Sequence, residues 1–244
     1  MKGLYYDLHI HSCLSPCGDD DMTPANIVGM AAVKGLDVIA LTDHNSCKNC
    51  PAALIHGKNY GVTVIPGMEL TTAEEVHVVC LFPSLPDAMA FDSYIYEHIL
   101  PIQNKEDIFG KQQIMNEEDE VTGTVERLLI SATDISFDNV FGLVAYYHGT
   151  AYPAHIDKTT TSLLSNLGFV PPDSTFRCAE IHDFRHLHQI RREHPYFLDC
   201  RMISSSDAHY LPDIHEAEYQ IYPSGREAAD VVAYLHAPPG EGDA

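Results

Sequence analysis

The sequence predicts an α/β fold in which a mostly parallel sheet closes into a barrel with helices outside. Apolar, strand-like runs alternate with helical segments along almost the whole chain, which is typical of successive βαβ units. Acidic and imidazole side chains stand at the ends of several of these runs, and in a parallel barrel such ends meet on one face. The pattern gives seven or eight strands, and a closed barrel accommodates them without exposed sheet edges.

The first half of the chain begins with a predicted strand over about 4–10. A helix should begin at Thr23-Pro24, because Thr is favoured as an N-cap and Pro at the first helical position, and it should end at Gly35. The mostly apolar run 37–42 is typical of a buried parallel strand. The remaining predicted elements of this half are a helix over 51–60 that ends near Gly61, a strand from 62–65 toward 69, a strand over 76–82 and a helix over about 85–102.

The acidic and poorly periodic segment at about 103–125 separates the two halves, and we expect an inserted loop or a short hairpin there. Apart from this insertion no linker is long enough to divide the chain, so we predict a single barrel domain over 1–237. Residues 238–244 are predicted to be a disordered tail. The predicted elements after the insertion are helices around 125–131 and 136–148, strands over 150–156, 178–182, 202–206 and 219–222, and a helix over about 225–236.

The net charge of -21 arises from 35 acidic residues against 14 lysines and arginines. Such a chain repels phosphate backbones over most of its surface unless a local patch or bound cations invert the field. We therefore expect a nucleic-acid polymer to be an unlikely partner. The 15 histidines suggest metal or proton chemistry, although a protein with many surface histidines would have the same count.

The beginning of the chain lacks the apolar segment of a secretory signal, and no apolar run is long enough to cross a membrane. The seven cysteines are an odd number, which favours reduced thiols over a disulfide framework. These features predict a cytoplasmic protein without a membrane partner, and they leave the oligomeric state open.

The DLHIH stretch holds the first candidate site. In a strand, Asp7, His9 and His11 share one face, whereas Leu8 and Ile10 point to the other face. Two imidazoles on one pleat can bind a divalent metal, and a carboxylate beside them can hold one ring in the correct tautomer. The alternative is an ordinary half-buried strand that happens to contain two histidines.

Polar residues at the ends of further strands favour the metal hypothesis. Each of them could be structural on its own, as a core histidine or as a carboxylate that caps a turn. Together they form a set of nitrogen and carboxylate ligands, which suits Zn, Mn or Fe better than Mg or Ca. These candidates are Asp43, His44, Glu69, His77, His155, Asp207 and His209.

Five ordered motifs, DLHIH, LTDHN, PGMEL, PAHID and SSDAH, resemble those of the polymerase and histidinol phosphatase (PHP) superfamily of metal-dependent phosphoesterases. The similarity extends over about residues 5–215. It implies a distorted (β/α)7 barrel, two or three divalent ions (Zn, Mn or Fe) at the C-terminal ends of the strands, and hydrolysis of a phosphoester. The first ion would take His9, His11 and Asp207, the second His77 and His155, with Glu69 bridging the two, and the third His44 and His209.

Cysteines near the same strand ends leave two alternatives open. Cys17 stands where some members of the superfamily have a further His or Asp ligand, and a thiolate there would favour Zn or Fe. Asp19 and Asp20 are the alternative ligands if Cys17 is merely packed. The second alternative concerns Cys13, Cys17, Cys47 and Cys50. They could form a separate zinc or iron–sulfur site, the C-x-x-C motif could be a redox pair, or all four could be free thiols.

The predicted reaction is in-line attack on phosphorus by a hydroxide held between metals bridged by Glu69. Asp207 or His209 would orient the hydroxide or protonate the leaving group. Lys158 would bind a phosphate oxygen, or it is an ordinary solvated lysine. The acidic composition favours a small phosphorylated substrate, such as a nucleotide or a sugar or amino-alcohol phosphate. A non-catalytic metal-binding or regulatory module on the same barrel is the alternative.

Overall fold

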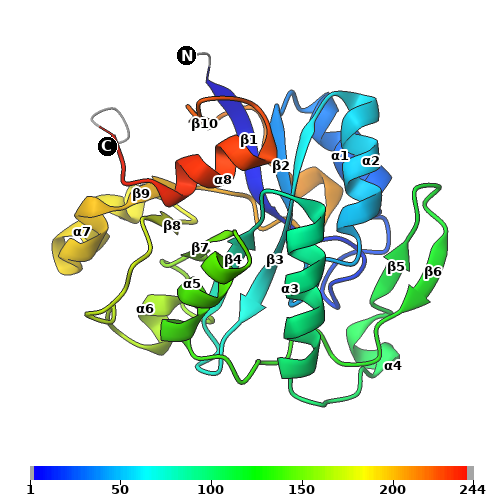
Figure 1. The fold of residues 1–244 in the computed structure, drawn as a ribbon, viewed down its shortest axis with the longest axis horizontal. Helices are drawn as coiled ribbons and strands as arrows, with labels where there is room; N and C mark the ends of the chain where they lie inside the picture. Colours follow the sequence, from blue (N-terminus) through cyan, green and yellow to red (C-terminus); the bar gives the residue numbers. More distant parts are fainter. Residues whose placement is uncertain (1–2, 241–244) are drawn as a thin grey trace.

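The structure is a computed structural model that describes residues 3–240, and strands and helices alternate along it (Figure 1). The strands are β1 (Leu4–Ile10), β2 (Val38–Leu41), β3 (Thr63–Thr71), β4 (His77–Leu81), β5 (Gln113–Met115), β6 (Val121–Thr124), β7 (Thr150–Pro153), β8 (Cys178–Glu180), β9 (Arg201–Ile203) and β10 (Gln220–Ile221). The α-helices are α1 (Pro24–Val33), α2 (Cys50–Tyr60), α3 (Leu85–His98), α4 (Glu106–Phe109), α5 (Phe137–Tyr146), α6 (Leu163–Asn166), α7 (Leu187–Glu193) and α8 (Ala228–His236). Three 3-10 turns are η1 (Phe184–His186), η2 (Pro195–Asp199) and η3 (Leu211–Asp213).

The main sheet has the strand order β10-β1-β2-β3-β4-β7 and curls into a distorted barrel, as the fold class predicted. The β8–β9 pair continues the curve, because the N–H of Ile156, after β7, donates to the carbonyl of Glu180 at 2.9 Å. The segment after β9 then pairs with the end of β1 through Ala208 and Ile10. The sheet is mixed rather than mostly parallel, since β4 is antiparallel to β3 and β7, and β10 is antiparallel to β1.

The direction of β4 determines where His77 lies. In the antiparallel β3–β4 pair, Thr71 is opposite His77, so the amino end of β4 lies beside the carboxyl end of β3. The polar strand ends therefore gather from the carboxyl ends of β1, β2, β3 and β7 and from the amino end of β4. We expected every site residue to come from the carboxyl end of a strand. The reversed strand β4 corrects this expectation for His77.

Local signals behave as predicted at the first two helices. The Thr23 side chain caps α1 by accepting the N–H of Asn26, and Pro24 occupies the first turn. Helix α2 ends at Gly61, whose φ of 72° lies in the left-handed region that favours glycine. Helix α3 ends at His98, earlier than predicted, because the next residue, Ile99, makes an isolated antiparallel bridge with Thr133.

The 103–125 insertion contains the short helix α4 and the β5–β6 hairpin, so the hairpin alternative is confirmed. In Figure 1 this hairpin lies at the right edge of the molecule, and α7 lies at the left edge. Helices α6 and α7 were not predicted. Of the predicted tail, residues 238–240 have no regular structure, and 241–244 lie outside the described residues.

The predicted helix over 125–131 is wrong. The side-chain amide of Gln112 donates to the carbonyls of Val125 and Arg127, and its oxygen accepts the N–H of Leu129. These backbone groups are therefore engaged in contacts that a helical turn would have to break.

Two apolar clusters hold the barrel together. The larger cluster lies between the sheet and α1, α2, α3 and α5, and the smaller one packs against α8. Leu8 belongs to the smaller cluster and Ile10 to the larger one, so the simple alternation predicted for β1 is wrong. The β1–β2 ladder shifts register between Asp7 and Ile10, and such an irregularity redirects side chains. No described helix is both long enough and apolar enough to cross a membrane.

Candidate metal centre

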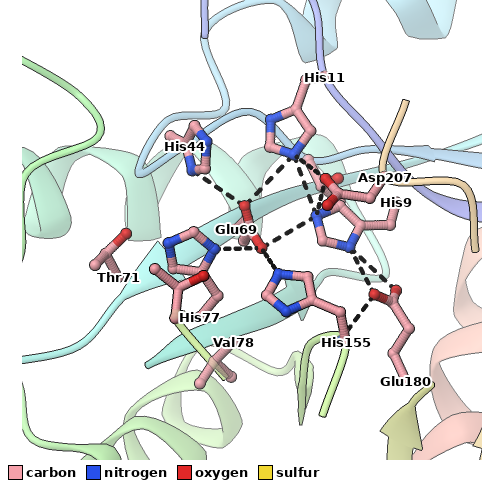
Figure 2. Close-up of polar contacts among 12 residues, drawn as sticks. His9, His11, His44, Glu69, Thr71, His77, Val78, His155, Glu180 and Asp207 are labelled. Carbon is pink, nitrogen blue, oxygen red and sulfur yellow. Dashed lines mark hydrogen bonds and ion pairs between the residues drawn. The ribbon is translucent and has the colours of Figure 1, made fainter. Parts of the chain in front are cut away.

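Glu69, near the carboxyl end of β3, is the centre of the site (Figure 2). It is only 1% exposed, and imidazole nitrogens face both of its carboxylate oxygens. Its Oε1 lies 2.8 Å from Nδ1 of His77, 3.1 Å from Nε2 of His155 and 3.3 Å from Nε2 of His9. These three histidines come from β4, from the segment after β7 and from β1, so the tertiary structure alone brings them to one carboxylate.

The second oxygen of Glu69 faces two further histidines. Its Oε2 lies 3.1 Å from Nδ1 of His44 and 3.4 Å from Nε2 of His11. Asp207 completes this side, with Oδ1 at 3.2 Å from Nε2 of His11 and 3.5 Å from Nε2 of His9. The two Nε2 atoms of His9 and His11 are themselves 3.2 Å apart.

The ligand atoms form three overlapping groups, and within each group they lie within 4.8 Å of one another. Two groups share Glu69, which is the arrangement that a bridging carboxylate requires. His155 was predicted as a ligand of the second ion, but among the described residues it belongs to none of the three groups, and His44 takes that place. The groups are His9, His11, Glu69 and Asp207; His44, Glu69 and His77; and His11, His44 and His209.

The donor set fits divalent ions. Nδ1 of His44 is buried and faces Glu69 without making a hydrogen bond to any described residue. A buried polar atom without a partner is unfavourable. An ion would satisfy this nitrogen and would also separate the carboxylates from the crowded imidazoles. Nitrogen and carboxylate donors together suit Zn, Mn or Fe.

The electrostatics favour metal-binding protonation states at Glu69 and His11. Burial alone would raise the pKa of the Glu69 carboxyl, but positive charge on neighbouring imidazoles, His77 foremost, holds that pKa well below its usual range. Burial lowers the pKa of His11 well below its usual range, and repulsion from His209 and His44 lowers it further. An ionised carboxylate and a neutral imidazole are the forms that bind metals.

Glu180, at the end of β8, supports His9 from behind, and the sequence analysis missed it. Its two carboxylate oxygens lie 3.0 and 3.1 Å from Nδ1 of His9, and Oε1 also accepts the N–H of His155 at 3.1 Å. Burial lowers the pKa of His9, but Glu180 and then Glu69 raise it well above its usual value. A carboxylate on Nδ1 directs Nε2 toward the site and fixes the tautomer. Its strand-end position, shared with the other candidates, was the signal that could have found it.

Asp7 does not orient an imidazole, contrary to the sequence-based expectation. Its carboxylate accepts the N–H of Ser206 and the N–H of His215, each at 3.0 Å. Asp7 therefore fixes the loop that carries Asp207. The irregular register in β1 turns Asp7 toward this loop rather than toward the histidines.

His11 has its own support. Its Nδ1 lies 3.0 Å from Oγ of Ser15, and that hydroxyl donates to Oδ1 of Asp43 at 2.7 Å. Asp43 was a strand-end candidate, and the structure places it behind the site rather than within a ligand group. The contacts of His11 with Ser15, and of Ser15 with Asp43, leave Nε2 of His11 directed at Glu69 and Asp207.

Lys158, Asp207 and His209 form the open side of the site. The Lys158 ammonium pairs with the Asp207 carboxylate, and 34% of the Lys158 side chain is exposed. The proposed phosphate-binding lysine therefore lies at the edge of the cluster. The backbone at Asp207 and His155 has φ of 53° and 28°, an unfavourable region for these residues that is common at functional sites.

Cys17 lies on this open side and is exposed. Its partial burial would raise the pKa of the thiol, but hydrogen bonds with His209 and His44 lower it to about 7. The thiol is thus placed beside the third group of ligands. It is outside all three groups found among the described residues.

The remaining candidate cysteines do not form a separate metal site within residues 3–240. Cys47 and Cys50 are buried, and their thiols face the carbonyl of Gly67 at 3.2 and 3.7 Å. Burial raises the pKa of Cys47 well above its usual value, which disfavours redox chemistry. Cys13 faces Asn49 and the carbonyl of Gln113 instead, and burial raises its pKa to about 12.

Comparison with known families agrees with this geometry. The model of the PHP domain matches residues 7–167, which contain most of the candidate ligands. The chain belongs to the PHP domain family. This membership confirms the predicted class of enzyme, a hydrolase that acts on phosphoester bonds, and supports divalent metals as its cofactors.

Two named relatives share part of the PHP domain. A 5'-3' exoribonuclease of Haemophilus influenzae is 37% identical over 79 residues, which are 31% of this chain and 28% of that protein. The 5'-3' exoribonuclease Rnm of Salmonella typhimurium is 33% identical over 95 residues, 35% of this chain and 31% of that protein. The matched segments span less than a third of either relative.

Solved structures share the fold. The lesion-specific endonuclease PfuEndoQ of Pyrococcus furiosus superposes with a TM-score of 0.68 at 17% identity, over 96% of this chain and 56% of that one. Endonuclease Q in complex with a 27-mer duplex that has an abasic lesion at the active site gives a TM-score of 0.59 at 20% identity, over 86% of this chain and 50% of that one. At these identities the likeness establishes the barrel alone.

The comparisons contradict the expectation of a small substrate and an unlikely nucleic-acid partner. Two relatives are named as exoribonucleases, and two of the structural neighbours are structures of an endonuclease, one of them in complex with a DNA duplex. The expectation was drawn from the net charge of -21. A net charge averages over the whole surface and does not describe the local field where cations bind.

Proposed function

We propose that this protein hydrolyses phosphodiester bonds at the end of a nucleic-acid strand, with RNA as the first candidate. The observation that carries the proposal is the carboxylate of Glu69, which five imidazoles face and which two of the three overlapping ligand groups share. The partial similarity to exoribonucleases supports RNA and cleavage from an end.

The burial of the site supports a strand end as the substrate. The histidines that face Glu69 are buried, whereas Lys158, His209 and Cys17 are more open. A phosphate therefore has to enter from one side. A terminal nucleotide reaches such a recess without bending the strand on both sides of the scissile bond.

We propose two or three ions from the set Zn, Mn and Fe, held by the ligand groups described above. Such ions, when bound, supply positive charge to the phosphate oxygens and lower the pKa of water. Lys158 would bind a phosphate oxygen once it exchanges its contact with Asp207. With ions in the two groups that share Glu69, His209 stays free of metal and would donate a proton to the leaving oxygen, and the backbone carbonyl of Asp207, 2.8 Å from its Nδ1, would orient its ring.

The test uses single-stranded RNA and DNA labelled at either the 5' or the 3' end, with protein whose Mn, Zn and Fe content has been measured. We expect stepwise shortening from one end, with mononucleotide release, and loss of this activity in Glu69→Gln. Internal nicking of a duplex with an abasic site would replace the strand-end assignment with an endonuclease. Failure of fully metal-loaded protein to cleave any of these nucleic acids would overturn the proposal.

A further inference from the structure

Basic side chains gather on α7 and in the turn just before it, in this otherwise acidic chain. Arg185, in the middle of η1, is followed by His188 and Arg192 on α7. Spacings of three and four residues place side chains on one helical face. All three residues are exposed. We call these three residues the α7 stripe.

The α7 stripe is anchored to the open side of the site. Asp157, the neighbour of Lys158, accepts the N–H of His182 at 2.7 Å, and its other oxygen lies 2.9 Å from Nδ1 of His186. The segment between β8 and α7 is therefore fixed against the segment that carries the candidate phosphate-binding lysine.

A surface groove accompanies the stripe. It has a volume of about 800 Å³. Its apolar wall includes Phe184, Leu187 and Leu198, of which Leu198 is 60% exposed. Its basic wall includes Arg191 and Arg192. An aromatic ring and exposed apolar side chains beside arginines form the kind of surface on which nucleobases stack while phosphates bind guanidinium groups.

Acidic residues also face the stripe. Asp183 accepts the Nε–H of Arg185 at 2.9 and 2.7 Å, and Glu193 lies 3.3 Å from Arg192. Both pairs lie between neighbouring residues at the surface, where an ion pair stabilises little and is screened by salt. A polyanion can therefore compete with Asp183 and Glu193 for these arginines.

We infer that the α7 stripe and its groove bind the single strand that extends from the site. Phosphates would bind Arg185 and Arg192, and a base would pack against Phe184. Charge complementarity favours this occupant, because all three residues of the stripe are basic, whereas the chain as a whole has a net charge of -21. The inference rests on the proposed function and specifies how the enzyme prefers strands over dinucleotides.

The test compares Arg185→Glu/Arg192→Glu with Lys58→Glu, using a dinucleotide and a single strand of about 12 nucleotides as substrates. Lys58 is exposed on α2, which leads into the opposite end of β3, and is a matched charge-reversal control. We expect the stripe variant to raise KM for the long strand about 10-fold or more. It should leave kcat/KM for the dinucleotide within about two-fold, and Lys58→Glu should change neither value.

Equal effects on both substrates, or no effect on the long strand, would overturn the stripe while leaving the proposed hydrolysis intact. Anisotropy with a fluorescent phosphorothioate strand and metal-loaded protein separates the two hypotheses. Binding that falls in the stripe variant, with a salt dependence shallower by about two ions, supports the stripe even if no hydrolysis is found. Binding that is the same in wild type, the stripe variant and Lys58→Glu contradicts it.

Discussion

The imidazoles around Glu69 and the cysteines at the start of α2 are both sets of metal-binding residue types beside strand ends, yet only the imidazoles converge on a carboxylate. Nitrogens from separate strands face one carboxylate, and one of them, the buried Nδ1 of His44, makes no hydrogen bond to a described residue. Cys47 and Cys50 instead point into the larger apolar cluster and toward backbone carbonyls. Residue type and spacing suggest a ligand, but the direction of the side chain decides whether one exists.

The support behind each set explains this difference. His9 and His11 are fixed from behind by Glu180 and by the Ser15 hydroxyl, so their Nε2 atoms are directed into a shared space. The cysteine thiols have no such acidic or hydroxyl partner directing them outward in the part of the chain that is described.

Glu69→Gln should reduce hydrolysis about 1000-fold or more, equivalent to about 4 kcal/mol of transition-state stabilisation. The amide keeps the shape but loses the charge that the five imidazoles face, so bound metal should also fall. Turnover on labelled RNA and elemental analysis measure both effects, and circular dichroism should show an unchanged fold. Activity near that of the wild type would remove Glu69 from the centre of the site.

Glu180→Gln should weaken metal binding or activity by about 10- to 100-fold, the usual effect of a supporting carboxylate. The loss would arise because His9 would no longer be held in its ligand tautomer by a charge. Competition with a chelating dye measures the affinity, and the surface variant Glu193→Gln serves as the control. An affinity equal to that of the control would show that Glu180 is only a packing residue.

Lys158→Gln should raise KM for a nucleic-acid strand about 10-fold, because a charge-assisted hydrogen bond to phosphate is lost. Lys158→Arg should retain most of the affinity, and the metal content should stay the same in both variants. A drop in metal content together with KM would indicate that Lys158 acts by holding Asp207 rather than by binding substrate.

Cys17→Ser tests a thiol that lies beside the histidines rather than inside the apolar core. If the thiolate is a ligand, the preference of the protein for Zn over Mn should fall several-fold, because a hydroxyl is a poor Zn ligand. Competitive loading followed by elemental analysis measures this preference. An unchanged ratio would place Cys17 with the packed cysteines.

Cys47→Ser/Cys50→Ser should leave metal content unchanged and should affect only stability. Placing hydroxyls in the apolar cluster should lower the free energy of unfolding by about 1–3 kcal/mol, and thermal unfolding should move down by about 2–4 °C for each kcal/mol. Loss of an equivalent of metal or iron would contradict the contrast drawn between the two sets.

The sequence by itself determined the barrel class, the helix boundaries with strong caps, and the residues that gather at the site. Thr23 and Gly61 act locally, so their signals can be interpreted without tertiary structure. Glu69 and the histidines that follow parallel strands could also be recognised, because the carboxyl ends of parallel strands meet at one edge of the sheet.

Only the tertiary structure decided the direction of β4, the loss of the helix over 125–131, the role of Glu180 and the fate of the cysteines. Each depends on a contact between residues far apart in the chain: Gln112 engages the backbone near Leu129, and Glu180 reaches His9. Local spacing carries no information about such partners. A polar or thiol group becomes a ligand, a support or a core residue according to what the fold brings within hydrogen-bond distance.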